Sequence, residues 1–301
     1  MSRITQIALI LALGVTPLPA LAKLDVFACE PEWAALAEAV GGQAVNAYAA
    51  TTALQDPHRI EARPSLIAKL RRADLLICSG AELEVGWLPM LLRQAGNKRV
   101  QPGTAGYFEA SAQVDRLDTD VALDRALGDV HSQGNPHVHL DPKRLARIAA
   151  ALASRLAALD PDNAAHYQTT HDAFAHRWQD AIATWEERAQ PLRGIPVVVH
   201  HKDWRYLFDW LGIVEAGTLE PKPGVPPSAA YLAQLKARLD DTPAQMAIHA
   251  AYQNKRPAQW LSQRAGIPTV ELPYTVGGSK RAQDLFTLYD DTIERLLAAL
   301  K

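Results

Sequence analysis

The chain has 301 residues, of which 31 are basic and 33 acidic, so its formal net charge at pH 7 is −2. Hydrophobic residues make up 48% of it, enough for one large folded domain or two smaller ones. A nearly neutral chain gives no reason to expect nucleic acid or an anionic membrane as a partner.

Residues 1–22 carry the features of a secretory signal peptide. Arg3 supplies a positive charge, residues 7–15 are apolar, and Ala20-Leu21-Ala22 forms a small-x-small cleavage site. We therefore expect a periplasmic protein that begins near Lys23. Because no cysteine lies next to the cleavage site, we expect no lipid anchor.

Short apolar strands alternate with helical patterns in the first half of the chain. We predict strands at 24–29, 45–48 and 73–78, and helices at 32–40, 64–72 and 82–94. This alternation predicts a parallel sheet covered on both faces. Ligands of such sheets bind beyond the carboxyl ends of the strands.

Helices dominate the middle of the chain. A helix at 143–159 precedes a longer one that begins near Asp160-Pro161-Asp162 and runs to about Gln190. One face of the long helix is apolar at helical spacing, with Tyr167, Phe174, Trp178, Ile182 and Trp185. At 1.5 Å per residue it would be roughly 43 Å long, enough to run along two lobes. We interpret His166, His171 and His176 on this helix as structural or solvated.

The alternation resumes after Gly194. We predict strands at 197–199, 245–249 and 269–272, and helices at 204–211, 228–239, 256–265 and 282–300. The predicted fold is therefore α/β, with two lobes that each hold a parallel-type sheet flanked by helices, joined by one long rigid helix. We expect the N-terminal lobe at 23–158, the linking helix at 159–192 and the C-terminal lobe at 193–301.

Two cysteines, Cys29 and Cys78, each follow a short apolar run. Each can therefore close a strand at the same sheet edge. In an oxidising compartment we predict that they form a disulfide, with two buried free thiols as the alternative.

Residues 129–142 contain three histidines and two aspartates. Neutral imidazole is the commonest protein ligand of zinc and similar metals. If Val138-His139-Leu140 were a regular strand, His137 and His139 would face the same side. Pro136 and Pro142 bracket the run, so a turn that separates the two histidines is an equally good alternative.

Histidines follow strands or turns at four places, two in each predicted lobe. These are Asp56-Pro57-His58, the segment 131–139, Val199-His200-His201 and Ile248-His249. Histidines at strand ends on both sides of a linking helix indicate a site in the cleft between the lobes.

An ordered set of motifs resembles the zinc- and manganese-binding proteins of bacterial ABC importers, the cluster A-I solute-binding proteins. The resemblance covers nearly all of residues 23–301. Its motifs are Gly41-Gly42, Asp56-Pro57-His58 with Arg63-Pro64-Ser65, Ala73-Asp74-Leu75, Leu83-Glu84, Gly134-Asn135-Pro136-His137 with Leu140-Asp141-Pro142, His201-Lys202-Asp203-Trp204 with Tyr206, and Glu220-Pro221-Lys222-Pro223-Gly224.

The resemblance implies a metal held between two lobes by His58, His137 and one histidine of the 200–201 pair. Tyr206 lies five residues after His201, where the family pattern has its aromatic residue, so the resemblance favours His201. The pattern of the residues alone cannot decide this pair, because a one-residue slip in a strand exchanges its faces.

The fourth ligand stays open. The family usually supplies an aspartate from the loop after the last strand, but this chain has Val270 to Gly278 there without one. Water, Glu271, His131, His139 or His249 could complete the site. Three imidazoles with at most one carboxylate favour Zn²⁺ over Mn²⁺. Binding should weaken as the pH falls through roughly 6.5, the ordinary pKa of histidine.

We therefore predict a periplasmic solute-binding protein, a monomer, that captures a divalent metal ion and delivers it to an ABC transporter permease in the inner membrane. The alternative is a secreted zinc-dependent hydrolase with three histidine ligands and a metal-bound water. Against an enzyme, the sequence has no HExxH motif. The only obvious acid near a predicted ligand is Glu61, which can equally be a carboxylate at the start of a helix.

Overall fold

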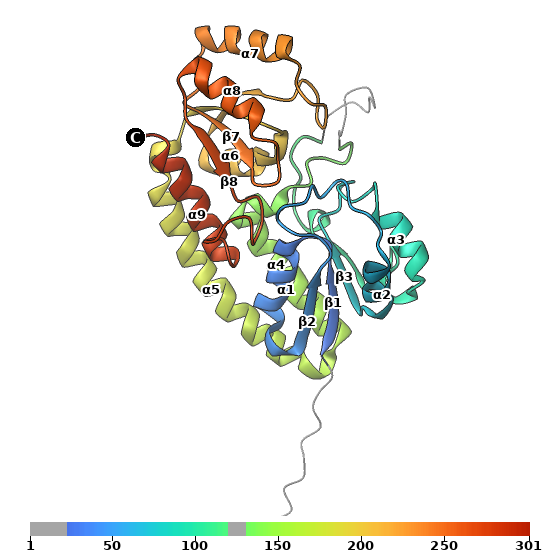
Figure 1. Cartoon of the computed structure of the whole chain (residues 1–301). Coiled ribbons are helices and arrows are strands. Elements are labelled where there is room, and N and C mark those ends of the chain that lie inside the picture. The colour runs from blue at the N-terminus through green and yellow to red at the C-terminus, as the bar shows by residue number, and fades with distance from the viewer. Residues whose placement is uncertain (1–22, 120–130) are drawn as a thin grey trace, which may run out of the picture.

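A computed structural model describes residues 23–119 and 131–301. The predicted signal peptide at 1–22 lies outside the described residues. The described chain forms two four-stranded sheets, each flanked by helices, and the two sheets lie in separate lobes (Figure 1). The α/β fold with two parallel sheets is thus confirmed.

The N-terminal sheet has the strand order β2-β1-β3-β4, and all its neighbours are parallel. Its strands are β1 (Leu24–Ala28), β2 (Val45–Ala49), β3 (Leu75–Cys78) and β4 (Tyr107–Glu109). The helices between them are α1 (Pro31–Gly41), α2 (Pro64–Arg72) and α3 (Leu88–Ala95). Cys29 follows β1 directly, Cys78 is the last residue of β3, and the two form the predicted disulfide.

The C-terminal sheet repeats this arrangement with the order β6-β5-β7-β8, again all parallel. Its strands are β5 (Pro196–Val199), β6 (Val214–Thr218), β7 (Met246–Ala250) and β8 (Thr269–Leu272). Its helices are α6 (Arg205–Leu211), α7 (Ala229–Asp241), α8 (Arg256–Ala265) and α9 (Leu285–Ala298).

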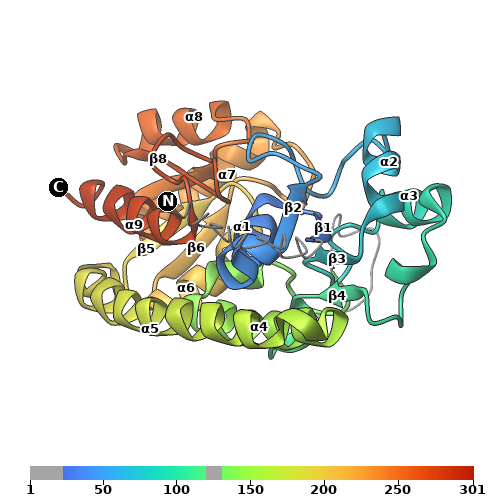
Figure 2. The same cartoon turned by 90° about the horizontal axis from the view of Figure 1, so that it is seen from below.

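The long helix α5 (Ala164–Arg188) runs beside both lobes, with α4 (Pro142–Leu159) packed along part of it (Figure 2). It contacts α1 and α4 on one side of the molecule and α9 on the other. The apolar face expected from the sequence is the buried one. None of the described helices combines the length and apolar character that a membrane span needs.

One apolar cluster extends through both lobes. It joins residues of the β1 sheet, the inner faces of α4 and α5, and residues of the β5 sheet. Near its centre Trp178 and Trp185 of α5 contact Tyr289 of α9, with ring centroids 5.4 and 4.8 Å apart. The lobes therefore share a core along α5.

Several sequence expectations were wrong in detail. The strands β4 and β6 were not predicted. α3 begins at Leu88 rather than near residue 82, because Ala81 and Glu82 have left-handed backbone angles (φ 48° and 69°) that end any regular helix. Of the two alternatives considered for Val138–Leu140, the structure has the turn, a 3₁₀ turn, and His137 and His139 contact the Tyr274 hydroxyl and the Tyr274 carbonyl respectively. α9 begins at Leu285, three residues later than predicted.

Candidate metal centre

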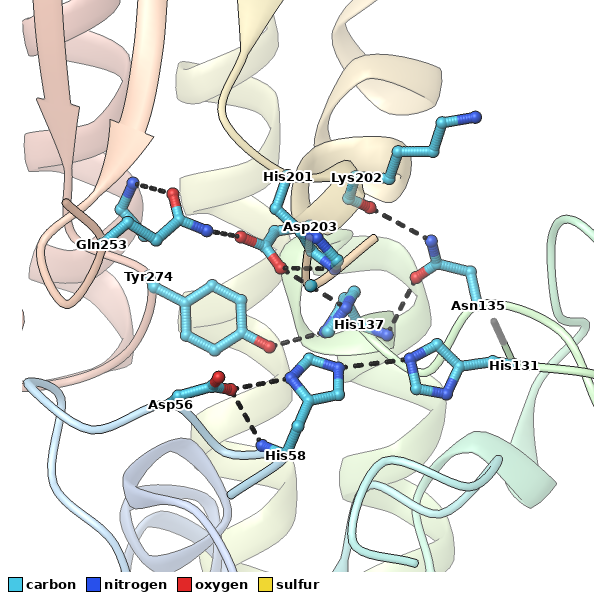
Figure 3. Close-up of polar contacts among 12 residues, drawn as sticks. Asp56, His58, His131, Asn135, His137, His201, Lys202, Asp203, Gln253 and Tyr274 are labelled. Carbon is cyan, nitrogen blue, oxygen red and sulfur yellow. Dashed lines mark hydrogen bonds and ion pairs between the residues drawn. The ribbon is translucent and has the colours of Figure 1, made fainter. Parts of the chain in front are cut away.

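Three histidines expected as ligands reach one place from separate elements (Figure 3). His58 lies between β2 and α2, His137 precedes the turn before α4, and His201 follows β5. The ring centroid of His58 is 5.9 Å from that of His137 and 5.7 Å from that of His201. All three rings are largely buried, with side chains 10%, 1% and 10% exposed. The structure thus brings these three predicted residues together.

A hydrogen bond holds the Nδ1 atom of each ring. The partner of His58 is Asp56 Oδ1 at 2.8 Å, and that of His201 is Glu220 Oε2 at 2.7 Å. The His137 Nδ1 lies 2.6 Å from the Tyr274 hydroxyl. With each Nδ1 so occupied, the opposite Nε2 is left to bind a ligand, and such outer contacts fix the tautomer and orientation of metal-binding imidazoles.

Two further donor groups point into the same place. The Nε2 atom of His131 is 3.2 Å from that of His58. Asp203 Oδ1 is 3.6 Å from His137 Nε2 and 3.8 Å from His201 Nε2. In each of the sets His58–His131–His137 and His137–His201–Asp203, one donor atom per residue lies within 4.8 Å of the others.

Burial and charge push the histidines of the centre in different directions. Burial, together with the neighbouring His58, lowers the pKa of His137 well below its ordinary value. Burial and the same neighbour lower the pKa of His131 to about 3. Burial also acts to lower the pKa of His201, but the charges of Asp203 and Glu220 outweigh it and raise that pKa to about 9. Burial thus favours the neutral form of His131 and His137, whereas the neighbouring carboxylates favour the protonated form of His201.

The other candidates for a fourth ligand face elsewhere. Glu271 is exposed, and its carbonyl accepts a hydrogen bond from Arg295. His139 Nε2 lies 3.0 Å from the Tyr274 carbonyl, and its Nδ1 lies 3.3 Å from Glu32 Oε1. His249 Nδ1 lies 3.1 Å from the Ala250 carbonyl. Of the protein candidates named from the sequence, His131 alone lies among the three histidines.

The motif residues beside the three histidines connect the two lobes at this point. The Asn135 side chain accepts a hydrogen bond from the His137 amide and donates one to the Lys202 carbonyl (Figure 3). The Tyr206 hydroxyl donates to the Asn135 carbonyl at 2.8 Å. These contacts explain why an asparagine and an aromatic residue accompany the histidines.

A cleft of about 670 Å³ is lined by His131, His137 and His201 among others.

Sequence reasoning missed Asp203. Its position two residues after His201, in the short turn Lys202–Trp204 before α6, is that of an ordinary helix-start carboxylate. The neighbouring Trp204 and Tyr206, apolar and fully buried, were the available sign that this carboxylate is buried too.

Comparison with known proteins agrees with the fold. The family described as "Zinc-uptake complex component A periplasmic" matches residues 26–300. The zinc-binding lipoprotein AdcA of Streptococcus pneumoniae (strain ATCC BAA-255 / R6) is 23% identical over 87% of this chain and 52% of AdcA. The high-affinity zinc uptake system protein ZnuA of Yersinia pestis is 27% identical over 61% of each chain.

The chain thus spans about half to three fifths of the length of these relatives. A solved structure, "Crystal structure of ZnuA", has the same fold, with a TM-score of 0.77 and 21% identity over 93% of this chain and all of that one. The match to residues 26–300 covers nearly all of the sequence, so the chain belongs to the family described as zinc-uptake complex component A, periplasmic.

Proposed function

We propose that this protein captures a divalent transition metal, with zinc preferred, and delivers it to an ABC permease in the inner membrane. His58, His137 and His201 would be its ligands. The observation that carries the proposal is the convergence of three buried imidazoles whose Nδ1 atoms are each held by Asp56, Tyr274 or Glu220. Such outer hydrogen bonds are typical of metal-binding histidines.

The nature of the donors favours zinc. Imidazole suits zinc, whereas manganese takes more oxygen ligands. Relatives named for each metal exist: AdcA is named for zinc and the ScaA lipoprotein of Streptococcus gordonii for manganese. We also propose that the chain acts in the periplasm, a location that the family description supports. The proposal includes cleavage of residues 1–22 and a monomeric protein.

A zinc hydrolase is the weaker alternative. It needs a carboxylate that can act as general base on a metal-bound water. Glu61, the acid considered from the sequence, is exposed. Membership in a family of solute-binding proteins also favours capture and delivery over catalysis.

Calorimetric titration of the metal-stripped protein with Zn²⁺ tests the proposal. We expect one tightly bound ion per chain and losses of orders of magnitude in affinity for His58→Ala, His137→Ala and His201→Ala. His176→Ala is the matched control, since that side chain is 82% exposed on α5. Weak binding by the wild type, or ligand variants that bind like the control, would contradict the proposal.

Delivery needs its own test. Cells that lack the protein should take up radioactive zinc slowly from zinc-poor medium. The wild-type chain should restore uptake, and His137→Ala should not. Equal uptake with and without the protein would show that metal capture serves another purpose.

A further inference from the structure

We propose that Asp203 is the fourth ligand of the bound metal. This assignment rests on the proposed function. The sequence left the fourth ligand open, because the loop after β8 lacks the aspartate that the family usually supplies there; in the structure Tyr274 of that loop contacts His137. In this chain the carboxylate would come from the turn after β5, two residues beyond the ligand His201.

The distances around Asp203 fit a shared metal ion. Ligand atoms about 2.1 Å from a tetrahedral zinc lie about 3.4 Å from one another. Asp203 Oδ1 is 3.6 Å from His137 Nε2 and 3.8 Å from His201 Nε2. Both distances are too long for a hydrogen bond, and both are close to the distance expected between two ligand atoms of a tetrahedral zinc site.

The surroundings of Asp203 fit a ligand as well. The residue is fully buried. Its Oδ2 accepts a hydrogen bond from Gln253 Nε2 at 2.6 Å (Figure 3). It accepts another from the Tyr252 hydroxyl at 3.2 Å, and the two bonds orient the carboxylate. Its Oδ1 has no hydrogen-bond partner among residues 23–119 and 131–301. A buried carboxylate oxygen without a partner is costly, and a cation placed against it removes that cost.

His131 is the competing candidate, because its Nε2 also faces the centre. Unlike Asp203 Oδ1, however, its Nε2 has a partner, the Nε2 of His58, and its ring also contacts the backbone of Ala81. With His131 as the fourth ligand, Asp203 Oδ1 would stay buried without a hydrogen-bond partner. Three histidines and one carboxylate make a complete four-ligand shell for zinc.

The charge of the shell follows from this assignment. Three neutral imidazoles and one carboxylate around a divalent ion leave a net charge of one. The carboxylate also adds an oxygen donor, which manganese accepts better than imidazole. The same four ligands therefore suit zinc and can also bind manganese, so we expect the transported ion to be a divalent transition metal that accepts both nitrogen and oxygen ligands.

Cobalt(II) titration tests the assignment, because the visible d–d absorption of cobalt reports its coordination while the titration gives its affinity. The test variant is Asp203→Asn, which keeps the side-chain volume. Asp56→Asn is the matched control, since Asp56 is a carboxylate that orients His58 without facing the metal. His131→Ala tests the competitor. Thermal unfolding of each metal-free variant checks that it is folded.

We expect Asp203→Asn to change the cobalt spectrum and to lose more than the 10–100-fold in affinity that an outer-contact change costs. Asp56→Asn should lose within that range and keep the spectrum, and His131→Ala should keep the spectrum. An unaltered spectrum and affinity in Asp203→Asn, or the loss appearing in His131→Ala instead, would overturn the assignment alone. A wild type that binds no metal would overturn the proposed function and the assignment with it.

Discussion

Tyr274→Phe removes one hydroxyl group, and we expect it to weaken zinc binding about tenfold. The hydroxyl lies 2.6 Å from His137 Nδ1 and is buried. When a metal occupies Nε2, the ring proton must sit on Nδ1, so the bound form needs an acceptor there. Without metal the ring can place its proton on Nε2, toward Asp203 Oδ1 at 3.6 Å. The hydroxyl therefore stabilises the bound form more than the free one.

The size of the effect follows from the cost of a buried donor without a partner. That cost is about 1–3 kcal/mol, and about 1.4 kcal/mol corresponds to a factor of ten in affinity. Tyr167→Phe is the matched control, because the Tyr167 hydroxyl donates to Asp160 at 2.8 Å on the fully buried side of α5, away from the centre. It should lower stability and leave zinc affinity unchanged.

The assay is competition for zinc between each variant and a chromogenic chelator at fixed pH, with thermal unfolding of the metal-free proteins measured in parallel. If Tyr274→Phe bound zinc as tightly as the wild type, the argument from tautomer fixation would be wrong. The same conclusion would follow if Tyr167→Phe lost as much affinity.

Three further predictions concern stability and motion. Replacing both Cys29 and Cys78 by alanine should lower the unfolding free energy by about 4 kcal/mol in urea titrations, because the disulfide closes a loop with a sequence separation of 49; an unchanged midpoint would contradict this. Burial raises the pKa of Glu84 to about 7 and, with the Glu84 charge, that of Glu30 well above its ordinary value. Stability from this pair is complete below about pH 4.5 and is lost as the pH rises through about 7, so Glu30→Gln should flatten the fall in unfolding free energy between pH 5 and 8. Metal-free and metal-bound crystal structures should superpose closely, and a large rotation of one lobe would refute this.

Much of the fold could be predicted because local patterns decide it. The apolar face of α5 and the runs that end at Cys29 and Cys78 depend on neighbouring residues alone. β4 and β6 escaped prediction because both are edge strands of three and five residues, only partly buried, without a strong apolar pattern. The late start of α3 depends on left-handed residues that no propensity indicates.

The site divides in the same way. Proline-linked motifs and the family resemblance indicated His58 and His137, and the spacing to Tyr206 indicated His201. Neither signal could indicate Asp203, because its buried environment includes Gln253, which lies 50 residues further along the chain. The separate contacts of His137 and His139 likewise depend on a 3₁₀ turn.

The position of the donors along the chain bears on how metal leaves the site. His58 and His137 precede α5, while His201 and Asp203 follow it, so rotation of one lobe away from the other would pull the shell apart. Such a rotation would also expose the apolar cluster shared along α5, including Trp178 and Trp185. Burial of each large apolar side chain stabilises the fold by about 1.5–3 kcal/mol, so separating the lobes would cost much free energy. Val138 and Trp204, beside His137 and Asp203, belong to this cluster, whereas the segment 50–63 that carries His58 contributes no residue to it. We therefore expect a permease to release the metal by moving the His58 segment rather than by separating the lobes.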